Sequence, residues 1–242
     1  MSYVLADFDN HLMNGFEFCK RAYSVIEEIR ISPNGIEKLR LRKGKLEKKL
    51  VEELLPIARY IQARYSHGRI LKVRWIDGTQ NYDARLLSSG YLADKGEVPK
   101  RQFIEVTTAV HEKDHIARDI LNKTGHSFGV KGVKQDPQTG KYVSQPYVYT
   151  NHNELSEDLA NRISQRIISK AKIKYPSNTS LVIQCFLDTL LFEGEWEKAI
   201  ESVKSRNIQH RFCEIFVFDS NHHYTATLYG GVCGKKNRRT VR

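Results

Sequence analysis

The segment at residues 180–187 (SLVIQCFL) is the strongest constraint on the fold, because nearly all of its side chains are apolar. A strand with one exposed face alternates apolar and polar residues, whereas a strand buried on both faces forms a near-continuous apolar run. Apolar residues at helical spacing flank this segment, at residues 154–174 and 194–205. The segment therefore predicts a sheet that is covered by helices on both faces.

The remaining patterns supply the other elements of an α/β domain. Helical spacing at residues 8–30 and 36–66 precedes three segments of strand character, at residues 69–76, 82–87 and 102–108. Alternation of helices and strands in the second half implies at least one crossover and a mixed central sheet flanked by helices. The other expected elements are a helix at 109–123, a hairpin or long loop at 126–152, and strands at 212–218 and 224–229.

A chain of 242 residues with 40% hydrophobic residues is long enough for one domain with a substantial core. We divide it into an N-terminal helical extension (1–45), an α/β core (46–230) and a basic C-terminal tail (231–242). Pro56 is expected to kink or split the helix at 36–66, because proline lacks a backbone N–H.

Charge points to a polyanionic partner. Lys and Arg total 39 against 28 Asp and Glu, which gives a net charge of +11. Nucleic acid is the first candidate partner, and a soluble basic protein without such a partner is the alternative. No apolar window is long enough to span a membrane, no signal-peptide pattern is found, and the four cysteines are scattered. We therefore expect a cytoplasmic protein without a membrane partner.

Two acidic residues lie in neighbouring predicted strands. Asp83 begins one strand (YDARLL), and Glu105 lies within the next (FIEVT). Strand geometry places Glu105 on the face opposite to its apolar neighbours, where a covered sheet would bury it. A buried carboxylate needs a cation or a donor. Two carboxylates plus waters suit Mg²⁺, and the alternative is a structural Glu105 paired with an arginine such as Arg85.

The order of these elements resembles the PD-(D/E)XK nuclease superfamily, which has the restriction-endonuclease-like fold, over roughly residues 46–218. In that family a strand bearing an Asp is followed by a strand bearing E-x-K. The resemblance implies that Asp83 and Glu105 hold Mg²⁺ or Mn²⁺ and that the main-chain oxygen of Val106 is a further ligand. It also implies phosphodiester hydrolysis, in DNA rather than RNA, by an endonuclease that can act as a homodimer.

One position departs from this pattern. The family lysine falls at Thr107, whose hydroxyl can hold a water but supplies no positive charge. A basic group from the following segment could substitute, and Lys113, Arg118 and His111 are candidates by sequence proximity. Glu53, on the apolar stripe of the leading helix, is a further catalytic candidate or a glutamate at the margin of that stripe. Without a substitute cation, the chain would be a nucleic-acid-binding protein of weak or no activity.

A second metal motif competes with this hypothesis. Residues 111–115 (HEKDH) match HExxH, in which two histidines on one helix face bind zinc and the glutamate is the base of a peptidase. Lys113 and Asp114 occupy the inner positions, where a cation beside Zn²⁺ is unfavourable. A zinc peptidase is therefore the second alternative, and two histidines on a solvated helix face are the structural explanation.

Overall fold

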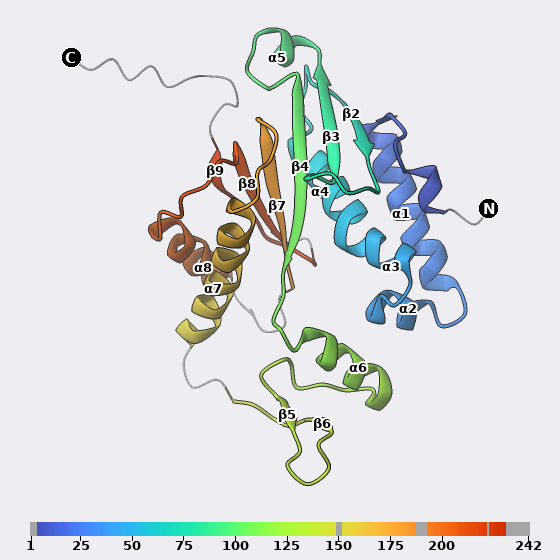
Figure 1. Ribbon diagram of the computed structural model, residues 1–242, viewed down its shortest axis with the longest axis vertical. Coiled ribbons are helices and arrows are strands. Elements are labelled where there is room, and N and C mark those ends of the chain that lie inside the picture. The colour runs from blue at the N-terminus through green and yellow to red at the C-terminus, as the bar shows by residue number, and fades with distance from the viewer. Residues whose placement is uncertain (1–3, 149–151, 187–192, 222, 231–242) are drawn as a thin grey trace.

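A computed structural model describes residues 4–148, 152–186, 193–221 and 223–230. Its main sheet has seven strands in the order β1-β2-β3-β4-β7-β8-β9, and β5 and β6 form a separate hairpin. Parallel pairing joins β4 to β7 and β7 to β8, and the other neighbours are antiparallel. Helices lie on both sides of the sheet (Figure 1). The predicted class, a mixed sheet flanked by helices, is therefore confirmed.

The strands are β1 (Met13–Asn14), β2 (Ile70–Trp75), β3 (Ala84–Ser89), β4 (Arg101–Ala109), β5 (Val133–Gln135), β6 (Tyr142–Ser144), β7 (Thr179–Cys185), β8 (Glu214–Asp219) and β9 (Thr225–Gly230). The helices are η1 (Leu5–Asp7), α1 (Gly15–Ile31), α2 (Gly35–Leu41), α3 (Lys45–Lys49), η2 (Leu50–Leu54), α4 (Leu55–Arg64), α5 (Tyr91–Asp94), α6 (Asp114–Thr124), α7 (His152–Ala171) and α8 (Glu193–Ser205). The basic tail expected at residues 231–242 lies outside the described residues.

Two predicted helices differ from the observed ones. The helix expected from residue 109 begins only at Asp114, because β4 continues to Ala109, which pairs with Cys185 of β7. The helix expected at 36–66 is divided into several segments, and η2 is a single stretch of π-helix that leads into α4. Pro56 stands in the first turn of α4, where its missing N–H removes a helical hydrogen bond from the preceding turn.

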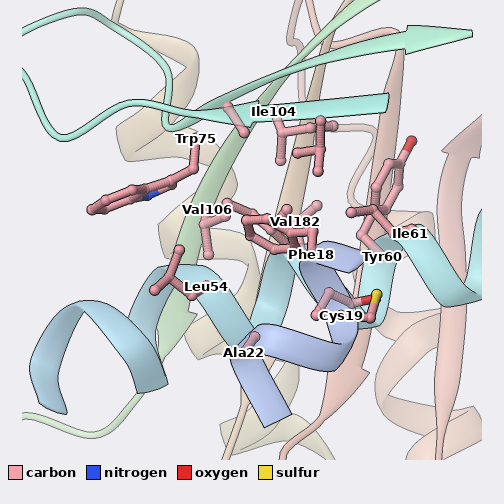
Figure 2. Packing of buried hydrophobic residues seen from close by; sticks show 14 of the residues in the cluster. Phe18, Cys19, Ala22, Leu54, Tyr60, Ile61, Trp75, Ile104, Val106 and Val182 are labelled. Atoms are coloured by element: carbon pink, nitrogen blue, oxygen red, sulfur yellow. The ribbon is translucent and has the colours of Figure 1, made fainter. Parts of the chain in front are cut away.

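One face of the sheet is covered by α1, η2 and α4, which share an apolar cluster with β2, β3, β4, β7 and β8. Figure 2 shows Phe18 and Ala22 of α1 directed toward Ile104 and Val182 of the sheet. Phe18 and Ala22 are almost completely buried. Helix α1, which lies in the predicted N-terminal extension, therefore contributes to the core.

The other face is covered by α7 and α8, over a second apolar cluster from β4, β7, β8 and β9. All seven residues of β7 are buried, as the run at residues 180–187 indicates for a strand covered on both faces. Within the described residues, no helix is both long enough and apolar enough to span a lipid bilayer.

Candidate functional site

Asp83 and Glu105 lie side by side where β3 begins. The antiparallel β3–β4 ladder begins with the pair Ala84 and Ile104, and Asp83 directly precedes β3. The Asp83 N–H donates to the Ile104 carbonyl at 2.8 Å, which holds Asp83 against β4. The Asp83 side chain reaches the Val106 N–H, one residue after Glu105, and the negative charge of Glu105 acts on it. The two carboxylates suggested by the sequence are therefore neighbours at the start of β3.

The Asp83 carboxylate is held by the backbone of the next strand. Its Oδ2 atom accepts a hydrogen bond from the Val106 N–H at 2.7 Å. Burial, followed by the negative charges of Glu105 and Glu53, raises the pKa of Asp83 to about 7, against the opposing effect of the Val106 N–H and of Lys170. A carboxyl group with this pKa exchanges a proton, or gains a cation, near neutral pH.

Glu105 is paired with a lysine from the helical layer above it. The Lys170 ammonium of α7 lies 2.5 Å from Glu105 Oε1. The Glu105 side chain is only 9% exposed and that of Lys170 is 25% exposed. The structure therefore pairs Glu105 with Lys170 and not with Arg85, the arginine that the sequence suggested. Arg85 instead donates to the Tyr82 hydroxyl at 3.2 Å.

Tyr175 also faces this site. Burial and the neighbouring charge of Glu105 raise the pKa of Tyr175. Its hydroxyl is buried and makes no hydrogen bond of acceptable geometry with the described residues. Tyr175 therefore adds a hydroxyl donor beside the Glu105 carboxylate.

Glu53 lies in the opposite layer, on η2. Its Oε1 accepts from Lys49 at 2.6 Å and its Oε2 accepts from the Trp75 indole at 3.0 Å. Both carboxylate oxygens are thus engaged, which favours the structural interpretation of Glu53. Its charge nevertheless acts on Asp83, as the raised pKa of that residue indicates.

The remaining predicted site residues lie apart from this pair or act through the backbone. Thr107 is two residues beyond Glu105 on β4 and is half-buried. Val106 contributes its N–H to Asp83, and the ligand role of its carbonyl remains a prediction. Lys113 donates to the Val133 carbonyl at 3.2 Å. Arg118 pairs with Asp114 at 2.8 Å, so the two sequence-proximal cations are used elsewhere.

The HEKDH motif does not form the helical arrangement of a zinc site. Residues 111–113 precede α6, so His115 is on that helix and His111 is not. His111 Nδ1 accepts from the Lys113 N–H at 3.1 Å, while His115 contacts the Glu112 carbonyl. The shared helix face assumed for the two histidines is therefore wrong, because the extension of β4 delays the start of the helix.

The donor atoms at Asp83 and Glu105 suit a hard cation. Within the described residues, no group of three or more His, Cys, Asp and Glu side chains is arranged to hold a metal. Mg²⁺, however, uses one or two carboxylates and keeps several waters. One oxygen of Asp83 is anchored by Val106 and one oxygen of Glu105 by Lys170. The second oxygen of each carboxylate could serve as a ligand.

Sequence reasoning missed Lys170, the cation nearest to Glu105. Lys170 is 65 residues away in the chain and belongs to a helix whose apolar stripe alone was informative. The only signal was its position near the end of that helix, eight residues after Arg162 and four after Arg166.

Comparison of the chain with models of protein families, with curated proteins and with solved structures gives no match.

Proposed function

We propose that this protein is a divalent-metal-dependent nuclease that hydrolyses phosphodiester bonds, in DNA rather than RNA, at Asp83 and Glu105. The single observation that carries the proposal is the hydrogen bond of 2.7 Å from the Val106 N–H to Asp83 Oδ2, which holds the Asp83 carboxylate against the residue that follows Glu105. The net charge of +11 favours a polyanionic substrate. The order of elements, with a three-strand meander followed by parallel strands, agrees with a restriction-endonuclease-like fold.

Each residue of the site would have its own role in hydrolysis. Asp83 and Glu105 would hold Mg²⁺ or Mn²⁺ through their second oxygens, with the Val106 carbonyl as an additional ligand. The bound ion lowers the pKa of its water and stabilises the negative charge of a phosphoryl transition state. Lys170, at 2.5 Å from Glu105, would supply the positive charge that Thr107 cannot supply. The Asp83 carboxyl must lose its proton to bind the ion, so activity should rise with pH near neutrality.

The second candidate function is nucleic-acid binding without hydrolysis. The Lys170–Glu105 ion pair favours it, because a lysine that neutralises Glu105 competes with a metal ion for the same carboxylate. This alternative predicts binding that weakens steeply with salt and no cleavage with any divalent metal.

A cleavage assay separates the two candidates. Labelled single- and double-stranded DNA and RNA are incubated with the full chain in Mg²⁺, in Mn²⁺ and in EDTA. Asp83→Asn and Glu105→Gln should each lower the cleavage rate about 100-fold or more, because losing about 3 kcal/mol of transition-state stabilisation has this effect. Matched controls are Asp94→Asn, at a side chain 71% exposed, and Glu28→Gln, at an exposed position of α1.

The controls should cleave as the wild type does. Equal rates in the wild type, Asp83→Asn and Glu105→Gln would reject the proposed site. Binding of nucleic acid without cleavage in either metal would favour the second candidate function.

A further inference from the structure

The half of the sheet formed by β2 and β3 has one face without a helical cover. The apolar cluster under α7 and α8 draws side chains from β4, β7, β8 and β9, and none from β2 or β3. Burial along β2 alternates, with Leu71, Val73 and Trp75 in the apolar cluster shared with α1 and α4. In Figure 1, α7 and α8 lie over the β7–β9 side of the sheet, away from β2 and β3. The uncovered face is continuous with the face that bears Glu105.

Four cations occupy this uncovered face, which we call the open basic face: Lys72, Arg74, Arg85 and Arg101. Strand alternation sets them opposite to the buried core positions, and Lys72 and Arg101 are exposed. Among the described residues, none of these four cations forms an ion pair. The ion pairs involve other cations, such as Arg21, which pairs with Glu17 on α1. The open basic face therefore carries positive charge that the described part of the chain does not neutralise.

Two of these cations face each other directly. Arg74 of β2 pairs with Arg85 of β3 in the antiparallel register. Like charges directly opposite in a ladder are destabilising. Arg85 also has a buried Nε without a hydrogen-bond partner among the described residues. An anion placed between the two guanidinium groups would relieve the repulsion and satisfy the donor.

An aromatic pair lies between the open basic face and the carboxylates. The rings of Tyr82 and Phe103 are 4.8 Å apart, and both side chains are half-buried. The Arg85 guanidinium lies 5.6 Å from the centre of the Phe103 ring. Arg85 and Phe103 each stand two residues from Asp83 and Glu105 along their strands, which is about 6.6–6.8 Å. Cations, rings and carboxylates thus follow one another across the same face.

We propose that the open basic face binds a single nucleic-acid strand and leads it to Asp83 and Glu105. The backbone phosphates lie on Arg74, Arg85, Lys72 and Arg101, and an unpaired base stacks on the ring pair. Stacking on aromatic rings beside a positively charged groove is the means by which proteins bind single strands without reading their sequence. This inference deepens the proposed function and rests on it for the role of the carboxylates.

Binding is measured in EDTA, where no metal-dependent cleavage occurs, by fluorescence anisotropy of a labelled oligothymidine and of a duplex of equal length. Arg74→Ala/Arg85→Ala should weaken single-strand binding at least tenfold. It should also reduce the slope of log K against log salt by about 1.4, since each phosphate contact contributes about 0.7. The matched control is Lys20→Ala/Lys48→Ala, which removes the same charge from exposed positions of α1 and α3.

The stacking step has its own variants. Tyr82→Ala should weaken binding of the single strand about fivefold or more while leaving duplex binding unchanged. Tyr82→Phe keeps the ring and should restore most of the single-strand affinity that Tyr82→Ala loses. A preference for the duplex, or equal binding by Tyr82→Ala and the wild type, would overturn the assignment to a single strand.

A stability measurement excludes simple misfolding of the arginine variants. Arg74→Glu places a carboxylate opposite Arg85, so its melting temperature should equal or exceed that of the wild type. Its affinity for the single strand should nevertheless fall at least tenfold. Weak binding together with a lowered melting temperature would indicate a structural role for Arg74 and contradict the proposal.

The outcomes distinguish this inference from the proposed function. Loss of binding in the arginine variants, without cleavage by the wild type in any metal, would retain the open basic face and reject hydrolysis. Cleavage that depends on Asp83, with binding unaffected in Arg74→Ala/Arg85→Ala relative to the lysine control, would retain hydrolysis and reject the open basic face.

Discussion

The two halves of the main sheet are built differently, although both share the helical layer of α1 and α4. In the covered half, formed by β4, β7 and β8, helices lie on both faces, and every residue of β7 is buried. In the open half, formed by β2 and β3, burial alternates and only one face carries core residues. The buried contacts of the covered half stabilise the fold. The open half leaves an exposed face whose charged side chains are accessible to a ligand.

The candidate site lies where these halves meet. Glu105 stands on β4, the strand shared by the covered half and its open neighbour, and Lys170 reaches it from α7. Asp83 comes from the open half. This position allows a carboxylate to be buried on one side while the adjacent face remains accessible, which is the combination a site for a large polyanion requires.

The contrast predicts that equal changes have unequal costs in the two halves. Ile183→Ala, at a completely buried side chain of β7, should lower the free energy of unfolding by about 2–5 kcal/mol. Ile70→Ala, at a side chain 51% exposed on β2, should lower it by less than about 1 kcal/mol. Urea denaturation measures both values. Similar losses would show that the open half contributes as much to stability as the covered half.

Replacing only one partner of the Lys170–Glu105 ion pair should lower the free energy of unfolding. Lys170→Met leaves Glu105 buried without its cation, and we expect a loss of about 1–3 kcal/mol in the free energy of unfolding. The double variant Lys170→Met/Glu105→Leu should recover most of that loss, because it removes the unpaired charge. If the double variant is no more stable than the single one, burial of the charge is not the cause.

The Asp83 carboxyl should make stability depend on pH in the absence of metal. Its pKa is raised from 3.8 to about 7 in the folded chain, so between these values the folded state binds more protons than the unfolded state. This contribution is fully present below about pH 4 and is lost as the pH rises through 7. In EDTA, Asp83→Asn should gain about 1–2 kcal/mol on the wild type between pH 5 and pH 8. If the difference in free energy of unfolding between Asp83→Asn and the wild type stays constant from pH 5 to pH 8, the raised pKa of Asp83 is contradicted.

The smallest effect is expected at the lysine suggested by sequence proximity. The Lys113 ammonium donates to the Val133 carbonyl near the hairpin, away from the carboxylates. Lys113→Ala should therefore change the free energy of unfolding by less than about 0.5 kcal/mol and leave any metal-dependent cleavage unchanged. Lys170→Ala is the comparison, and a larger loss of cleavage in Lys113→Ala would reverse the assignment of the cation.

Periodicity predicted the elements well where one pattern dominated. The apolar run at residues 180–187 predicted β7, and the alternating segment at 69–76 predicted β2, because side-chain burial follows backbone period. The start of α6 was missed, since pairing of Ala109 with β7 extends the strand at the expense of the helix. Tertiary pairing thus overrode local helical preference.

By itself, the sequence determined the mixed sheet, its flanking helices and the two acidic residues worth testing, because burial patterns and charges are written locally along the chain. Only the tertiary structure decided that Lys170 contacts Glu105 and that Arg74 faces Arg85. It also decided that HEKDH lies mostly outside a helix. These facts depend on strand register and helix docking, which arise from contacts between segments far apart in the chain and leave no periodic signal at either residue.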